Sequence, residues 1–258
     1  MTLRWRTRAR GLGFGLSQRV GDQKEFSERS FSQSLSVYVS ETGRVFAKRT
    51  VTSHRGKRRS GDKSNCKWLK DAIDEAQAEG LWTIVSMHKV CISAAEKPCE
   101  VGGELLNLLV EHKVDLVLQG HEHGYQRTKQ LSLGPDCPEL EPDVYNAGCV
   151  ASDGSDSGVF QRGAGPVFVV SAAFGQDPYP INLDDPELPY IAIWMDDSNE
   201  SKGWMEFTVS KDRIDGHFVA VSGPLTDSFT ISGTAVVAPV TPDVTPEVTP
   251  DVTPRAKP

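Results

Sequence analysis

The chain has 258 residues, of which 38% are hydrophobic and 24% are charged, which excludes a wholly disordered protein and allows a sizeable core. No stretch reaches the roughly 18–20 uninterrupted apolar residues of a transmembrane helix, so no membrane span is expected. The net charge of −7 divides unevenly along the chain. Residues 1–63 carry 15 basic and 5 acidic side chains, a net charge of +10, whereas residues 64–258 carry 13 and 30, a net charge of −17.

The basic first part, residues 1–63, is rich in Arg, Ser and Gly and lacks a sustained hydrophobic period. Two short runs, 35–39 and 44–46, allow a hairpin across the segment 41–43. The Arg and Lys cluster at 55–59 suits phosphates, so a nucleic-acid-binding protein is one alternative. We favour a poorly patterned, solvated segment and do not expect a nucleic-acid partner, because no recognition motif accompanies the charge and the acidic remainder repels phosphate.

A regular pattern begins near residue 64. Ser64 or Asn65 caps an amphipathic helix, which is followed by a buried strand over 81–87. A second helix over 103–112 leads into a second strand over 114–118. This order predicts parallel strands joined by crossover helices, with functional residues in the loops beyond the carboxyl ends of the strands.

The sequence after residue 130 is β-rich and ends in a repeat. Strands are predicted over 167–171, 190–194, 204–209, 213–221 and 228–231. A Val-Thr-Pro-Asp/Glu repeat over 240–254 cannot pack a core and is typical of an extended, disordered linker or stalk. The predicted class is α/β (α+β), a parallel or mixed sheet with crossover helices followed by a β-rich half. The predicted divisions are 1–63, 64–232 and 233–258.

Three histidines follow the two predicted parallel strands. His121 and His123 lie directly after the strand 114–118, and His88 follows the strand 81–87. Neighbouring strands lie about 5 Å apart, so the three imidazoles are expected to converge. Neutral imidazole is the commonest metal ligand in proteins. A single histidine at such a place is more often a hydrogen-bonded polar residue, but the agreement of two loops favours a metal site.

The segment 120–127, Gly-His-Glu-His-Gly-Tyr-Gln-Arg, resembles the GHxHxYxR motif of the calcineurin-like metallophosphoesterases, and most closely their purple-acid-phosphatase branch. The order of helices and strands over residues 64–232 is also similar. The resemblance implies a four-layer sandwich. It also implies a phosphatase or phosphodiesterase with two divalent or trivalent ions, Fe, Zn or Mn, whose bridging hydroxide attacks the phosphorus of a phosphoester substrate.

The resemblance also implies roles for five residues. His88 and His121 are expected to bind one metal and His123 the other, so these three are the predicted catalytic residues. Arg127 and Tyr125 are expected beside the centre, as a phosphate contact and a packing or hydrogen-bonding neighbour. The segment 172–189 is expected to form part of the substrate rim.

The sequence departs from this family in its first part. Complete members supply Asp-x-His, Gly-Asp and Gly-Asn-His-(Asp/Glu) motifs before the first helix, and residues 1–63 contain none of them. Lys89 also follows His88 where many relatives have proline. Three imidazoles without a bridging carboxylate hold one Zn²⁺ rather than two metals. We therefore expect the C-terminal half of a metallophosphoesterase, truncated at its N-terminus, with a catalytically deficient metal-binding remnant as the alternative.

Five cysteines are more than a typical cytosolic domain carries. Cys91 and Cys99 flank one short loop, Cys137 and Cys149 flank another, and pairing within each loop leaves Cys66 over. Two disulfides are favoured over reduced, buried thiols, and each is expected to contribute about 2–3 kcal/mol. Together with the predicted stalk, they favour an extracellular or cell-envelope protein attached through its C-terminal repeat, although no signal peptide is recognisable at the start of the chain.

Overall fold

The computed structural model describes residues 2–5, 32–41, 44–54, 63–154 and 158–233. Its helices are α1 (Lys63–Ala78) and α2 (Gly103–Glu111), with short 3-10 helices η1 (Ala147–Cys149) and η2 (Leu188–Tyr190). The basic cluster at 55–59 and the repeat at 240–254 lie outside the described residues. Within those residues, no helix is both long and apolar enough to cross a membrane.

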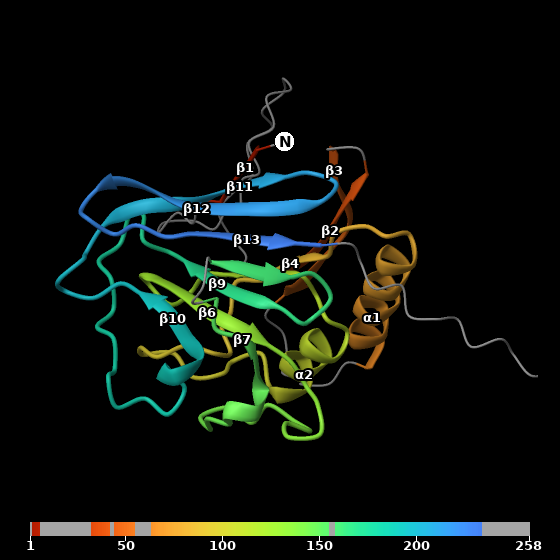
Figure 1. The fold of residues 1–258 in the computed structure, drawn as a ribbon, viewed down its shortest axis with the longest axis horizontal. Helices are drawn as coiled ribbons and strands as arrows, with labels where there is room; N and C mark the ends of the chain where they lie inside the picture. Colours follow the sequence, from red (N-terminus) through yellow and green to blue (C-terminus); the bar gives the residue numbers. More distant parts are fainter. Residues whose placement is uncertain (1, 6–31, 42–43, 55–62, 155–157, 234–258) are drawn as a thin grey trace, which may run out of the picture.

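The described strands form two mixed sheets (Figure 1). The larger sheet has the order β10-β6-β9-β5-β4-β2-β3, with β7 paired to β6. Its strands are β2 (Ser32–Glu41), β3 (Arg44–His54), β4 (Ile84–Ser86), β5 (Leu116–Gln119), β6 (Tyr125–Leu131), β7 (Val150–Ser152), β9 (Val167–Ser171) and β10 (Ile191–Trp194). The smaller sheet, in the order β1-β11-β12-β13-β8, contains β1 (Thr2–Trp5), β8 (Val159–Gln161), β11 (Lys202–Val209), β12 (Arg213–Ser222) and β13 (Ser228–Ser232).

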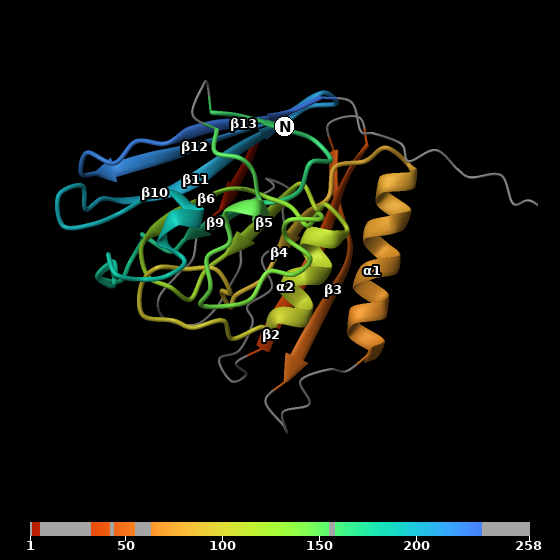
Figure 2. The same cartoon turned by 60° about the horizontal axis from the view of Figure 1, so that its bottom comes forward.

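Alternating side chains of the central strands build two cores. Val85 and Val117 pack with the apolar faces of α1 and α2. Ile84 and Leu116, their neighbours along the same strands, pack with the smaller sheet. Successive side chains of a strand point to opposite faces, so the larger sheet lies between the helices and the smaller sheet, as Figures 1 and 2 show.

This arrangement has three layers in the described part of the chain, whereas the family resemblance implied four. No described helix covers the outer face of the smaller sheet. The alternation along β11 explains why this face tolerates water: Met205, Phe207 and Val209 are buried, while Glu206 and Thr208 between them are more exposed. A sheet that is mainly antiparallel, with one apolar and one polar face, needs a covering layer on one side only.

The central strands follow the predicted order. β4 pairs parallel with β5, and β5 pairs parallel with β9. The predicted strand at 167–171 coincides with β9, and the predicted helix at 103–112 corresponds to α2. Because β4 and β5 are parallel neighbours, their carboxyl ends meet at one edge of the sheet. Strand β6, which contains the end of the histidine motif, pairs antiparallel with β9 and was not predicted.

Residues before 63 also contribute strands. β2 and β3 form the hairpin that the segment 41–43 allowed, and β2 pairs antiparallel with β4. β1 pairs antiparallel with β11 of the smaller sheet. The runs 35–39 and 44–46 thus lie within β2 and β3, whereas β1 was not predicted. The description of residues 1–63 as a basic, poorly patterned segment stays a prediction. The division of the chain at residue 63 stays a prediction.

Candidate metal centre

Backbone hydrogen bonds join the residues that follow β4 to the end of β5 and to the loop after it. The N–H of Met87 donates to the carbonyl of Leu118 at 2.9 Å, and the N–H of Gly120 donates to the carbonyl of His88 at 3.2 Å. These bonds continue the parallel ladder into the loops. They place the imidazoles of His88 and His121 edge to face, with 4.9 Å between ring centroids and an interplanar angle of 63°.

The spacing and ionisation of this pair suit a metal ion. Two imidazoles that share one tetrahedral ion through nitrogen atoms 2.0–2.1 Å away have centroids about 5 Å apart. Burial lowers the pKa of His88 to about 4, with contributions from nearby His121 and Lys89. Burial, followed by the charge of Lys89, also lowers the pKa of His121. Both rings are therefore neutral at pH 7, which is the form that binds metals.

His121 also contacts an ion pair from the loop after β4. Its Nε2 atom lies 2.8 Å from Nζ of Lys89 and 2.7 Å from Oε2 of Glu100, and the Lys89 and Glu100 atoms are 2.6 Å apart. The backbone of His121 is left-handed, with φ of 65°. No sequence pattern predicted Glu100, because the return of its loop brings it to the site. Its carboxylate adds an anionic oxygen to the pair of imidazoles.

The third histidine of the motif is directed elsewhere. His123 stacks on Tyr179, with 4.4 Å between centroids and an interplanar angle of 12°, and its carbonyl accepts a hydrogen bond from the Tyr179 N–H at 2.9 Å. Nζ of Lys97 lies 4.7 Å from the centroid of the Tyr179 ring. The segment 172–189 thus reaches the site through Tyr179.

The donor set does not fit a two-metal centre. In the part of the chain that the structure describes, no group of three or more His, Cys, Asp or Glu side chains is arranged to hold a metal ion. The expected convergence of three imidazoles is therefore not observed. His123 stacks on Tyr179 instead. His88 and His121 have the chemistry for one ion, with Glu100 as the nearest carboxylate.

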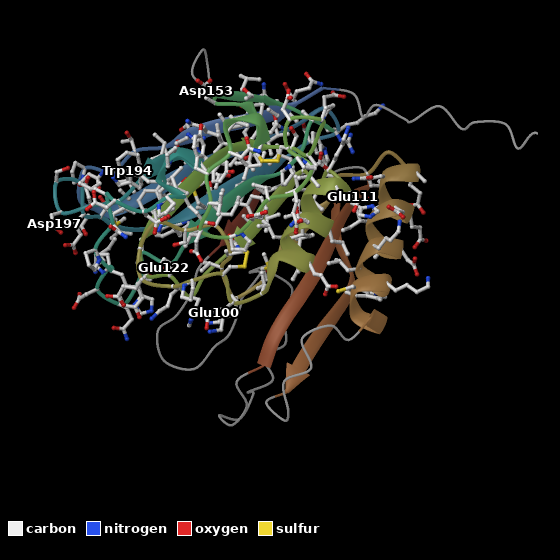
Figure 3. All side chains as sticks on the ribbon, turned by 90° about the horizontal axis from the view of Figure 1, so that it is seen from below. Glu100, Glu111, Glu122, Asp153, Trp194 and Asp197 are labelled. Carbon is white, nitrogen blue, oxygen red and sulfur yellow. A yellow bond between two sulfur atoms is a disulfide. The ribbon has the colours of Figure 1, made fainter. Side chains whose placement is uncertain are left out.

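The residue between the two motif histidines points into the protein. Glu122, labelled in Figure 3, is fully buried and accepts hydrogen bonds from the Lys97 N–H at 2.7 Å and the Ser93 hydroxyl at 3.2 Å. Burial raises the pKa of Glu122. Sequence reasoning missed this residue, although a carboxylate inside a metal motif was an available signal. Glu122 anchors the motif to the loop that follows His88.

Tyr125 and Arg127 are directed between the two sheets. The Arg127 guanidinium donates to both carboxylate oxygens of Asp227, at 2.7 and 3.0 Å, and the Tyr125 hydroxyl donates to the same carboxylate at 2.5 Å. All three residues are buried. They join β6 of the larger sheet to the start of β13 in the smaller sheet, so both side chains are engaged in the interior. Their expected contacts with substrate stay predictions.

Both disulfides favoured by the sequence are formed. Cys91 is bonded to Cys99 and Cys137 to Cys149, while Cys66 in α1 lies outside both bridges. The first bridge closes the loop directly after His88, and the second closes the loop that follows β6. Disulfides of this kind are typical of proteins in oxidising environments.

A second buried carboxylate supports the same loop. Glu187 is 3% exposed and accepts hydrogen bonds from the N–H groups of Ser93 at 3.1 Å and Asp143 at 3.0 Å. Burial raises the pKa of Glu187 to about 7, and the charges of Asp185 and Asp143 add to the shift. Glu187 thus links the loop after β4 to the loop after β6.

We expect the contribution of Glu187 to the free energy of unfolding to fall as pH rises. The folded pKa of about 7 exceeds the ordinary value of 4.5, so the folded state holds the proton more tightly. The stabilisation is complete below about pH 4.5 and is lost as pH rises to about 7, by about 3 kcal/mol. Urea unfolding at pH 5 and pH 7.5 measures this loss. The change in unfolding free energy between the two pH values should be larger in the wild type than in Glu187→Gln, and the difference is the contribution of Glu187. Parallel pH profiles for the two proteins would contradict this prediction.

The known proteins that are similar to this chain match it over only part of its length. No protein-family model matches the chain. Two uncharacterized proteins of Mycobacterium tuberculosis, from strains CDC 1551 / Oshkosh and ATCC 25618 / H37Rv, are each 36% identical over 78 residues, which is 27% of this chain and 15% of the relative. The structure of purple acid phosphatase PPD1 from yellow lupin seeds is similar over 68% of this chain and 29% of its own, with 18% identity and a TM-score of 0.46. The chain therefore spans a minor part of each relative.

Proposed function

We propose that this chain supplies the histidine side of the metal centre of a phosphoester hydrolase, of the phosphatase or phosphodiesterase type. The observation that carries the proposal is the pairing of His88 with His121, 4.9 Å apart, at the carboxyl ends of parallel strands. His121 is the first histidine of the motif 120–127, which resembles the metallophosphoesterase signature. A divalent cation held there supplies a Lewis acid for a phosphoester oxygen.

The residues around the pair suit an anionic substrate. Nζ of Lys89 lies next to His121, and Nζ of Lys97 lies over the ring of Tyr179. Ammonium groups attract phosphate as point charges. In this proposal His88 and His121 hold the ion, His123 takes part once Tyr179 moves from its ring, and Arg127 and Tyr125 position the motif through Asp227. A second metal of the kind that the resemblance implies would require carboxylate ligands that the described residues do not bring to this pair.

A second candidate function is metal binding without turnover. The observation that favours it is the Lys89–Glu100 pair, with 2.6 Å between its charged atoms. Glu100 is the carboxylate in contact with the histidine pair, and Lys89 neutralises it. A site of this composition binds a cation weakly and leaves little negative charge to hold a second one.

Metal analysis combined with hydrolysis of p-nitrophenyl phosphate tests both functions. We expect the full chain to bind Zn²⁺ or Co²⁺, and we expect His88→Ala and His121→Ala to lose at least about 90% of the bound metal, because each removes a ligand. His217→Ala is the matched control, since His217 lies on β12 in the smaller sheet. Turnover that disappears with the metal supports the hydrolase, and metal binding without turnover supports the second candidate. Equal metal content in all variants contradicts both.

A further inference from the structure

We propose that Lys89 is a built-in cation that competes with the metal ion for His121 and Glu100 and so sets the metal affinity of the site. This inference rests on the proposed function, because it concerns the same pair of histidines. It adds a residue that opposes metal binding to those that favour it.

The contacts of Lys89 are those that a bound cation makes. Its Nζ atom lies 2.8 Å from Nε2 of His121 and 2.6 Å from Oε2 of Glu100. When Lys89 donates to His121, it uses the lone pair of Nε2 that a metal needs. When Nε2 instead carries the proton and donates to Glu100, that lone pair does not exist. In both arrangements the ion must displace a contact that the protein already makes.

The fold holds Lys89 and Glu100 at this place. The carbonyl of Lys89 accepts a hydrogen bond from the side chain of Gln119 at the end of β5, at 3.3 Å. Glu100 follows the Cys91–Cys99 bridge, and its N–H donates to the carbonyl of Val90 at 3.1 Å. The ring closed by the disulfide therefore returns Glu100 to the residue next to Lys89, and the pair does not depend on chance contact between flexible side chains.

The environment makes this competition strong. The side chains of Lys89, Glu100 and His121 are 21%, 32% and 24% exposed, so water screens their charges only in part. A divalent ion next to His121 would lie within contact distance of the ammonium group. Repulsion at such a distance is large at the effective dielectric constant of a partly buried site. Metal binding therefore requires Lys89 to move out to solvent and Glu100 to exchange its partner.

Removal of the ammonium group should strengthen metal binding. We expect Lys89→Met to raise the affinity for Co²⁺ at least about tenfold, because the competitor and its repulsion are both removed. Lys97→Met is the matched control: it makes the same change of charge in the same loop, but Nζ of Lys97 lies over Tyr179, and we expect a change of less than about threefold. Adding Glu100→Gln to Lys89→Met should reverse the gain, because it removes the carboxylate released to the metal.

Titration of the full-length chain with Co²⁺, followed by the visible absorption of the bound ion, measures these affinities. Equal affinity in the wild type and Lys89→Met overturns this inference and leaves the proposed function standing. Absence of binding in every variant overturns both. Lys89→Gln repeats the test if Lys89→Met does not fold.

Labelling of the wild type by an amine-specific reagent gives an independent measurement. Saturating Co²⁺ should increase labelling of Lys89 several-fold and leave Lys97 unchanged, as measured by mass spectrometry. Unchanged labelling of Lys89 in protein shown to hold Co²⁺ contradicts the inference.

Discussion

Replacement of Asp227 by alanine is expected to lower the free energy of unfolding by about 3–5 kcal/mol, because it leaves a buried charge without its partner. Arg127 is 5% exposed and donates two hydrogen bonds to Asp227, and the Tyr125 hydroxyl donates a third. The guanidinium also lies over the ring of Phe229, 5.2 Å from its centroid, in an apolar setting. Without the carboxylate, neither donor reaches an equivalent acceptor.

Urea unfolding at pH 7 measures this loss. Asp215→Ala is the control, since Asp215 lies on β12 and forms its ion pair with the more exposed Arg213, and its cost should be below about 1 kcal/mol. The double variant Arg127→Met, Asp227→Leu should recover much of the lost stability, because an apolar pair replaces a buried ion pair at little cost. A loss below 1 kcal/mol in Asp227→Ala would show that the guanidinium reaches water, contrary to this structure.

Removal of the Cys137–Cys149 bridge is the second large effect. Changing both cysteines to serine should reduce the free energy of unfolding by about 3 kcal/mol, since the bridge closes a loop of moderate length in the unfolded chain. Both cysteines are fully buried, so the two hydroxyl groups add a desolvation cost. Asn107 of α2 holds the same loop through two hydrogen bonds with Leu140, of 2.8 and 2.9 Å. The loop therefore stays in place while the global stability falls.

Unfolding in urea with and without a reductant checks the value. Reductant should destabilise the wild type further than the double-serine variant, which retains only the Cys91–Cys99 bridge. Cys66→Ser is the control and should change stability by less than about 1 kcal/mol, because Cys66 lies in α1 outside both bridges. A double-serine variant as stable as the wild type contradicts the assigned contribution.

The sequence predicted the elements whose burial follows a simple period. β9, β11, β12 and β13 lie where alternating or continuous apolar runs placed them. β6 was missed because most of its residues are polar and yet buried. Its polar side chains find partners far along the chain: Gln130 donates to the carbonyls of Gln161 and Gly165, and Thr128 accepts from the N–H of Phe168. Such partners are created by the tertiary fold and leave no periodic signal.

The same distinction applies to the candidate site. The strand order predicted that His88 and His121 would meet, because parallel neighbours end at one edge of a sheet. The stacking of His123 on Tyr179 and the position of Glu100 depend on loop conformation. Loop conformation follows from disulfide closure and buried carboxylates rather than from hydrophobic pattern, so the sequence indicated the donors and not their full arrangement.

The position of Glu122 makes the histidine motif sensitive to redox conditions. Its carboxylate is held by Ser93 and Lys97, and both residues lie inside the ring that Cys91 and Cys99 close. We expect reduction of this bridge to open the ring and to loosen the groups that hold Glu122, and with them the backbone between His121 and His123. The disulfide therefore couples the directions of the two motif histidines to the oxidised state of one loop.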